Sequence, residues 1–222
     1  GAGDDVLRGQ DDDDTLNGGD GHDRLFGGLG QDTLIGIAGN DVIYGDAGND
    51  TLNGGDGIDQ LHGGDGDDRI IGGAGNDRMI GGAGRDYMTG GSGVDRYVFS
   101  DGDLGSSQAT ADVITDFNPS EGDRLDLSAI TSAGPFTLMG VFAFTGTGRA
   151  EINWGQEGNG SYIFGDVDGD GVADFYIRLL NLFVVHPSHI IDARVGNLSD
   201  TYYIINDPSD TTNEVLNGGY DR

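Results

Sequence analysis

A strict nine-residue period constrains the first 98 residues of this chain more than any other feature. Ten consecutive units, beginning at residue 9, follow the pattern Gly-Gly-x-Gly-x-Asp-x-U-x, in which U is apolar. Residues 1–8 match the end of an eleventh unit. The sixth place is always Asp and the eighth is always apolar, so the period predicts a stack of similar structural units.

The composition of one unit predicts how it folds. Six residues rich in Gly and Asp favour a sharp turn, because Gly adopts positive φ without steric cost. The other three, such as Thr51-Leu52-Asn53, alternate between outward and inward side chains and predict a three-residue strand. Since each turn reverses the chain, two units form an 18-residue coil, and stacked coils bury a continuous apolar row. We therefore expect an all-β fold.

Stacked turns also predict a metal ion. Turns on the same edge of the stack lie about 4.8 Å apart, and carboxylates at that spacing repel one another. A hard divalent cation removes the repulsion, and Gly-rich turns offer carbonyl oxygens beside the carboxylates. Calcium accepts six to eight oxygen ligands in loose geometry, so it suits such a site better than magnesium.

The repeat resembles the calcium-binding nonapeptide repeat of RTX, or hemolysin-type, proteins. This resemblance implies a right-handed parallel β-roll in which each ion lies between a turn and the next turn on the same edge. One implied column of ligands contains Asp5, Asp23, Asp41, Asp59, Asp77 and Asp95, and the other contains Asp14, Asp32, Asp50, Asp68 and Asp86. Neighbours within the columns give at most five plus four, or nine, ions. Turn glycines complete the implied metal sites: Gly18, Gly19, Gly21, Gly54, Gly55, Gly57, Gly63, Gly64, Gly66, Gly72, Gly73, Gly75, Gly81, Gly82 and Gly84.

Some units depart from the pattern. Gln10, Ile37 and Asp46 replace the second Gly, and Asp12 replaces the Gly of the fourth place. Asp tolerates a left-handed backbone better than most residues, but less freely than Gly. We expect the first full unit to be frayed or poor in ions, and the five units of residues 54–98 to be best occupied.

Composition excludes several partners. The 222 residues carry a formal net charge of −28, which argues against nucleic acids and anionic membranes as partners. No apolar run approaches the length of a membrane span, and the first residues do not resemble a signal peptide. An acidic, Gly-rich composition alone would indicate disorder, but the strict period opposes that interpretation when calcium is present. The sequence begins inside a repeat, so we expect it to be part of a longer protein.

The second half of the chain predicts further short strands. The period stops at Tyr97-Val98-Phe99, and a loop over 100–111 leads to a strand at 112–117, a turn and a return strand at 124–127. Residues 112–129 resemble the C-terminal domain of serralysin-type metalloproteases, which has an Asp-x-Ile-x-Asp-Phe strand, a Gly-Asp turn and an Ile-Asp-Leu-Ser segment. Further strands are expected at 136–144, 150–154, 161–164 and 173–180. This half is predicted to be a β-sandwich or a continuation of the roll.

A second acidic motif covers residues 166–174. Asp166, Asp168 and Asp170 occupy the first, third and fifth places and Asp174 the ninth, which resembles the first part of an EF-hand loop. The Glu expected at the twelfth place is absent, since that residue is Ile177. A similar hairpin occurs in serralysin-type domains, so the resemblance implies one more calcium ion here. The alternative is an acidic hairpin turn without an ion.

The last residues depart from the serralysin-type pattern. Residues 189–191 are His-Ile-Ile where that family has an Asp-Phe-aliphatic end, and about thirty more residues follow. We therefore expect three regions: an RTX roll at 1–99, a serralysin-like β domain at 100–196, and the start of a further repeat module or linker at 197–222.

No sequence motif indicates a catalytic centre. His22 and His62 occupy variable places of the repeat, and His186 and His189 flank a Pro without the spacing of a helical zinc motif. We expect a non-catalytic calcium-binding module of a large, type I-secreted bacterial protein, with calcium, the adjacent domains and the secretion machinery as partners. The alternative is the C-terminal region of a secreted protease, lipase or polysaccharide epimerase. Exposed aromatics such as Tyr44, Tyr87 and Trp154 suggest a cell-surface polysaccharide as a further partner.

Overall fold

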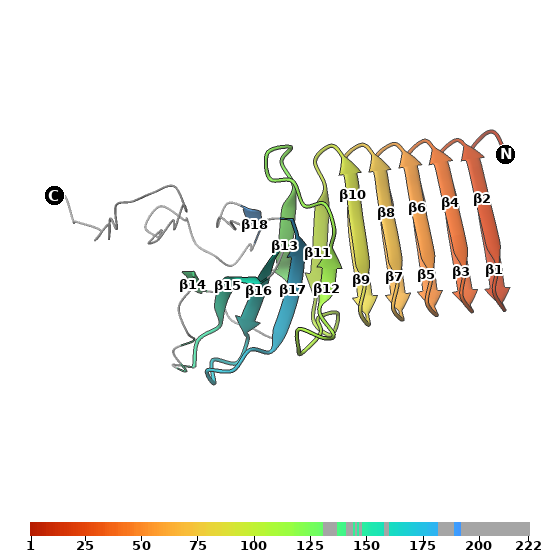
Figure 1. Cartoon of the computed structure of the whole chain (residues 1–222). Helices are drawn as coiled ribbons and strands as arrows, with labels where there is room; N and C mark the ends of the chain where they lie inside the picture. The colour runs from red at the N-terminus through yellow and green to blue at the C-terminus, as the bar shows by residue number, and fades with distance from the viewer. Residues whose placement is uncertain are drawn as a thin grey trace.

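The computed structural model describes residues 1–130, 137–140, 144, 146, 148–157, 160–181 and 189–191. Within these ranges the chain consists of β-strands joined by turns and loops, and no helix is long and apolar enough to cross a membrane. The strands form two sheets, with the repeats at one end and the strands of the second half at the other (Figure 1). The predicted all-β parallel roll is confirmed.

Each repeat unit contributes one strand, and successive strands alternate between the two sheets. Among the strands of the repeats, the odd-numbered ones lie in one sheet and the even-numbered ones in the other. The strands of the repeats are β1 (Val6–Asp11), β2 (Thr15–Asp20), β3 (Arg24–Leu29), β4 (Thr33–Ala38), β5 (Val42–Ala47), β6 (Thr51–Asp56), β7 (Gln60–Asp65), β8 (Arg69–Ala74), β9 (Arg78–Ala83), β10 (Tyr87–Ser92) and β11 (Arg96–Ser100).

The register of the strands follows the 18-residue coil. Leu34 pairs with Leu52 in parallel, and Leu52 pairs with Ile70. The apolar residues of the eighth place consequently stack inside the roll, and from Leu25 to Tyr97 each has an exposed fraction of 0%. This buried row is the core that the period predicts.

The strands are longer than the sequence predicted. Each strand of the repeats from β1 to β10 has six residues rather than three, because the first three residues of each unit continue the parallel ladder. The second-place glycines permit this: Gly55 has φ +104° and pairs with Gly73 of the next coil. A Cβ on Gly73 would overlap the carbonyl oxygen of Gly55, so glycine suits this close approach of the coils.

The units that lack a glycine keep the same backbone conformation. Gln10, Asp12, Ile37 and Asp46 have φ values of 90°, 77°, 91° and 75°. These are the four departures from the pattern within the repeats, and each carries a side chain where the fold demands positive φ. The strain is greatest at Ile37, because a β-branched residue rarely adopts this region.

The second half of the chain continues both sheets instead of forming a separate sandwich. Strand β12 (Asp112–Ile114) pairs in parallel with β10, and β13 (Arg124–Ala129) pairs in parallel with β11. The predicted return strand at 124–127 is therefore wrong as a hairpin partner of 112–117, because the two segments lie in different sheets. Together they form one more coil of the roll. The loop at 100–111 connects β11 to the first strand of this coil.

The remaining strands extend the two sheets beyond this coil. They are β14 (Thr137–Gly140), β15 (Glu151–Glu157), β16 (Gly160–Asp166), β17 (Phe175–Leu180) and β18 (Ile190–Ile191). Strand β17 pairs with β12 in parallel, β16 pairs antiparallel with β15 and β17, and β18 pairs with β13. Residues 197–222, predicted to begin a further module, lie outside the described residues.

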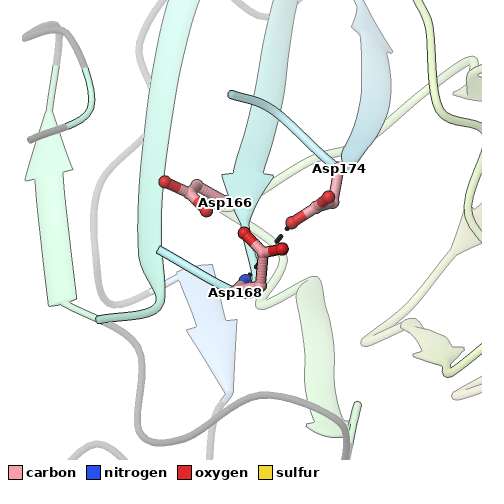
Figure 2. Close-up of side chains that lie close together, drawn as sticks. All are labelled: Asp166, Asp168 and Asp174. Atoms are coloured by element: carbon pink, nitrogen blue, oxygen red, sulfur yellow. Dashed lines mark hydrogen bonds between the residues drawn. The ribbon is translucent and has the colours of Figure 1, made fainter. Parts of the chain in front are cut away.

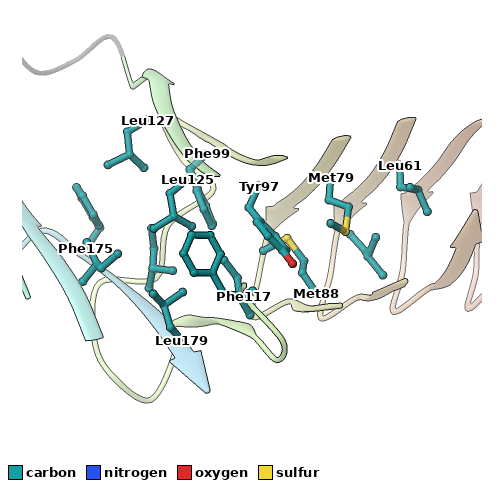
Figure 3. Packing of buried hydrophobic residues seen from close by; sticks show 14 of the residues in the cluster. Leu61, Met79, Met88, Tyr97, Phe99, Phe117, Leu125, Leu127, Phe175 and Leu179 are labelled. Atoms are coloured by element: carbon teal, nitrogen blue, oxygen red, sulfur yellow. The ribbon is translucent and has the colours of Figure 1, made fainter. Parts of the chain in front are cut away.

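Larger apolar side chains cover the end of the repeat core. Tyr97, Phe99 and Phe117 follow the row of Leu61, Met79 and Met88, and the rings of Tyr97 and Phe117 lie 5.8 Å apart (Figure 3). Leu125, Phe175 and Leu179 continue the same buried cluster into the second half. One core therefore joins the repeats to the second half of the chain.

Replacing Ile37 with Gly should stabilise the roll. The left-handed conformation costs an L-residue about 1–2 kcal/mol, while Gly costs roughly 0.5–1 kcal/mol of additional backbone entropy. The exposed Ile37 side chain contributes little burial, so Ile37→Gly should raise the free energy of unfolding by up to about 1 kcal/mol in a urea titration with saturating calcium. Ile35→Gly, on the same strand without positive φ, should lower it. Equal losses in the two variants would contradict this account.

Candidate metal sites along the edges of the roll

The turns place the sixth-place aspartates in two columns, one along each edge. The backbone N–H of Asp41 donates to Oδ1 of Asp59 at 2.8 Å, and that of Asp50 donates to Oδ1 of Asp68 at 2.7 Å. The same bond recurs along each edge from Asp5 to Asp95 and from Asp14 to Asp86. The structure thus brings the predicted aspartates together in the two predicted columns.

The second oxygen of each carboxylate is buried without a protein partner. This holds for Oδ2 of Asp14, Asp23, Asp32, Asp41, Asp50, Asp59, Asp68, Asp77, Asp86 and Asp95. From Asp23 to Asp95 these residues have exposed fractions of 0–2%. Buried polar atoms are normally paired, because leaving one unpaired costs free energy. The same unpaired oxygen in coil after coil indicates a ligand that the polypeptide itself does not supply.

The first-place glycines border these oxygens. A Cβ on Gly54 would overlap Oδ2 of Asp59 and would lie 2.7 Å from the carbonyl oxygen of Gly72 on the next coil. The missing side chain therefore leaves room where a carboxylate oxygen and a carbonyl oxygen from adjacent coils converge. Oxygens of these two types are the ligands that calcium prefers, so the residues present fit the ion.

Burial makes the ionised columns unfavourable in the absence of a cation. It raises the pKa of Asp59 to about 6, of Asp68 to about 8 and of Asp77 to about 7. The hydrogen bond from the preceding coil opposes this rise, and the neighbouring carboxylates of the column add to it. Burial is also the main reason why the pKa of Asp86 rises to about 7 and that of Asp95 to about 6. A divalent cation would stabilise the charged carboxylates directly.

Two further aspartates join the columns, and sequence reasoning missed both. The N–H of Asp86 donates to Oδ1 of Asp112 at 2.9 Å, and the N–H of Asp95 donates to Oδ1 of Asp123 at 3.0 Å. The loops before them lengthen the separation to 26 and 28 residues, so the nine-residue frame does not contain them. The signal that could have found them is Asp-x-U, which recurs at Asp112-Val113-Ile114 and Asp123-Arg124-Leu125.

The acidic hairpin between β16 and β17 brings together three of its four predicted ligands. Carboxylate oxygens of Asp166, Asp168 and Asp174 lie within 4.8 Å of one another (Figure 2). Asp166 is fully buried and accepts the N–H of Gly169 at 2.6 Å and that of Gly171 at 2.8 Å. Asp170 is not part of this group. These hydrogen bonds shape the turn without a metal, so an ion here stays a prediction.

The remaining residues singled out in the sequence are not members of the columns. Nδ1 of His22 accepts the N–H of Asn40 at 2.7 Å, and the His62 ring stacks on Tyr44 at 4.5 Å. The other face of Tyr44 stacks on Phe26 at 5.3 Å, so neither face is free for a sugar ring. The guanidinium of Arg85 lies over the ring of Tyr87, 5.0 Å from its centroid. His186 lies outside the described residues.

Two family matches correspond to the two halves of this architecture. The RTX calcium-binding nonapeptide repeat matches residues 1–34 and 26–61. The peptidase M10 serralysin C-terminal family matches residues 58–191, more than half of the chain. The chain belongs to the serralysin C-terminal family. Both resemblances noted in the sequence are thereby confirmed, and the repeats of this serralysin C-terminal chain are of a type that binds calcium.

Two solved structures similar to this serralysin C-terminal chain come from one enzyme. The solution structure of the AlgE6R3 subunit from the Azotobacter vinelandii mannuronan C5-epimerase is 27% identical, covers 92% of this chain and 93% of that chain, and has a TM-score of 0.47. The AlgE6R2 subunit from the same epimerase is 26% identical, with coverages of 86% and 94% and a TM-score of 0.43. A comparison with curated protein sequences gives no match.

Acidification should favour folding without calcium and oppose calcium binding. The folded pKa values of Asp59, Asp68 and Asp77, about 6–8, lie above the ordinary value of 3.8. Their contribution to stability is therefore fully present below about pH 3.8 and is lost as the pH rises through 6–8. In chelator, circular dichroism should show more β-structure at pH 4.5 than at pH 7.5. With calcium, the midpoint of folding should shift to higher calcium as the pH falls. A calcium-free signal that does not change with pH would contradict this prediction.

Replacing a central aspartate should weaken calcium-induced folding more than replacing the outermost one. Asp77 is 1% exposed, and its place within a column predicts that it contacts an ion on each side. The Asp5 side chain, at the open end, is 47% exposed. Asp77→Asn keeps an acceptor for the N–H of Asp59 but removes the charge. Interactions with charged groups contribute about 1.5–3 kcal/mol, so the calcium midpoint should rise about tenfold. The matched Asp5→Asn variant should barely move it, and equal shifts would mean that ions are not shared between coils.

Proposed function

We propose that this chain is a non-catalytic calcium-binding module of a larger, type I-secreted bacterial protein. It folds when it meets calcium outside the cell, and it then stabilises or presents the neighbouring domains. The observation that carries this proposal is the run of ten buried, unpartnered Oδ2 atoms from Asp14 to Asp95. Membership of the serralysin C-terminal family and the RTX repeats support it.

In the described part of the chain, no salt bridge neutralises a buried aspartate of the columns. Among the residues described, the salt bridges join the N-terminus to Asp5 and Arg96 to Asp126. Neither involves a buried aspartate of a column. A folded roll at neutral pH therefore depends on an external cation, because buried unpaired charges are strongly unfavourable. The fold and the ion are coupled in the same way as in other metal-dependent small domains.

Because of this coupling, folding of the module depends on the calcium concentration of the compartment. Extracellular calcium modules bind with dissociation constants of about 10⁻⁴–10⁻³ M. An ion adds stability only when its concentration exceeds that constant, and at 100 times the constant the gain is about 2.7 kcal/mol for one site. Several sites in one stack make the response steep. The chain would remain unfolded where free calcium is scarce, in a form suited to the secretion machinery, and would fold in the calcium-rich exterior.

We assign the two halves different roles on the same pair of sheets. Residues 1–99 form the calcium-binding roll, and residues 100–196 form the cap that covers its last coil. Tyr97, Phe99 and Phe117 lie in the buried cluster between them. Repeat stacks require such a cap because a terminal repeat has no neighbour to cover its core. Residues 197–222 are proposed to begin a further module.

A second candidate function is the C-terminal region of a secreted enzyme. The observation that favours it is the family itself, which is described as the C-terminal part of a peptidase. The 222 residues contain no His-Glu-x-x-His motif, so a catalytic domain of that type would lie outside this chain. The neighbouring sequence of the parent protein separates the two candidates. A His-Glu-x-x-His motif there supports a protease, and additional repeats without one support the non-catalytic module.

Calcium removal tests the proposed function directly. The roll should be disordered in chelator at pH 7.5, because backbone ordering costs about 1–2 kcal/mol per residue and the ionised columns add repulsion. Far-ultraviolet circular dichroism should show a β-spectrum after addition of millimolar calcium. Magnesium at the same concentration controls for ionic strength and should have a much smaller effect. Full β content in chelator at pH 7.5 would reject the proposal.

A further inference from the structure

Asparagine is followed directly by glycine at two places in the repeats. Asn17-Gly18 lies in β2 and Asn53-Gly54 lies in β6. In each pair the asparagine holds the ninth place of one unit and the glycine the first place of the next. A glycine in this position leaves the asparagine open to attack by the backbone, because Gly has no Cβ to obstruct the approach of its own nitrogen.

The reaction that such a pair undergoes is an intramolecular deamidation. The backbone nitrogen of Gly54 loses its proton to water and attacks Cγ of Asn53. The Cγ–Nδ2 bond breaks, and the departing nitrogen takes a proton from water and leaves as ammonia. Water then opens the five-membered succinimide at either of its two carbonyls. One opening gives aspartate, and the other gives isoaspartate, whose main chain runs through Cβ and Cγ and is one carbon longer. Nothing is oxidised or reduced.

The folded roll keeps the two reacting groups of Asn53-Gly54 apart. Asn53 pairs in parallel with Ile35 of β4 on one side and with Ile71 of β8 on the other, so β6 is an inner strand of its sheet (Figure 1). A parallel strand holds ψ near about +115° and directs side chains out of the sheet, away from the next backbone nitrogen. Gly54 is also buried. Attack therefore requires β6 to leave the ladder.

Asn17 is held less firmly than Asn53. Strand β2 is the last strand of its sheet at the N-terminal end and pairs along its length with β4 alone, while an isolated bridge joins Asp20 to Ala2. Asn17 is exposed, whereas Asn53 is half-buried. Terminal elements open with a lower free energy than inner ones. The same reactive pair therefore occurs once at the edge of the stack and once inside it.

We propose that Asn53-Gly54 is a spontaneous modification site that is open only while the chain lacks calcium. The inference rests on the proposed function, in which the chain stays unfolded until calcium completes the aspartate columns. A calcium-free chain holds this pair in a flexible backbone, and folding closes the site. The time that a chain spends without calcium is then recorded in its covalent structure.

Isoaspartate at position 53 prevents the coil from stacking. The additional main-chain carbon displaces Gly54, which has no free space around it. A Cβ there would overlap Oδ2 of Asp59 and would lie 2.7 Å from the carbonyl oxygen of Gly72. The register of β6 with β4 and β8 is lost as well, because it depends on constant main-chain length. A chain that has reacted in this way no longer folds when calcium arrives.

Peptide mass spectrometry measures the reaction at each asparagine. Cleavage after arginine gives the peptide 25–69, which contains Asn53 together with Asn40 and Asn49, each followed by aspartate. After days at pH 7.5 in chelator, the amide-to-acid mass change should appear at Asn53 and much less at these two internal controls. Saturating calcium should slow the reaction at Asn53 by about tenfold or more, and at Asn17 by a smaller factor.

Circular dichroism and a urea-unfolded sample separate the possible failures. Equal rates at Asn53 in a calcium-folded and a chelator-unfolded chain would overturn this inference and leave the proposed function intact. No reaction at Asn53 in urea would also overturn this inference alone. A chain that is already folded in chelator, with Asn53 unreacted there and reacted in urea, would overturn both.

Refolding after incubation tests the effect of the modification. Asn53→Thr is the matched control, because Thr89 holds the same place in β10 and threonine cannot undergo the reaction. After equal incubation in chelator, calcium should restore more β-structure in Asn53→Thr than in the unmodified chain. Unmodified molecules that stay unfolded should be enriched in isoaspartate at position 53. Equal recovery of the two proteins, with Asn53 converted in the unmodified chain, would overturn the assigned effect.

Discussion

The hydrogen bond from each turn to the next turn on the same edge organises this structure. The N–H of Asp41 donates to Oδ1 of Asp59, and the bond recurs at every coil. It fixes the register of neighbouring turns, and it also holds the second oxygen of each carboxylate in a buried position. The contact that orders the stack therefore also buries a carboxylate oxygen that has no protein partner. On the proposed function, folding and calcium binding are coupled, because the same side chains take part in both.

The close approach of the coils favours glycine at the first two places of each unit. Second-place glycines such as Gly55 and Gly73 adopt positive φ and stack against a carbonyl of the preceding coil, while first-place glycines such as Gly54 leave room for the carboxylate. Backbone and carboxylate oxygens are thereby concentrated at the edges, and apolar side chains are confined to the interior. Ile37 shows that the fold tolerates a side chain at a second-place position, where it is exposed and strained.

Sequence periodicity predicted the coil, the buried apolar row and the two columns of aspartates, because each follows from a side chain's place in the repeat. It did not predict the six-residue strands, since the pairing of Gly55 depends on carbonyls of another coil. It also missed Asp112 and Asp123, whose positions depend on how β12 and β13 stack rather than on spacing in the chain. For the same reason the sequence could not show that the carboxylate of Asp170 stands apart from its three neighbours.

The two ends of the roll differ in ways that give folding a direction. At the open end the Asp5 side chain is 47% exposed, and Leu7 and Leu16 are only partly buried. At the other end Tyr97 and Phe117 cover the core, and burial raises the pKa of Asp112 to about 8. The apolar core is therefore more completely covered beside the cap than at the open end. Because a repeat is stable only when a neighbour covers it, the coil next to the cap is the first that can hold its ions with a complete neighbour. Order should then spread from that coil toward the N-terminal turns, each new coil completing the sites of the one before it.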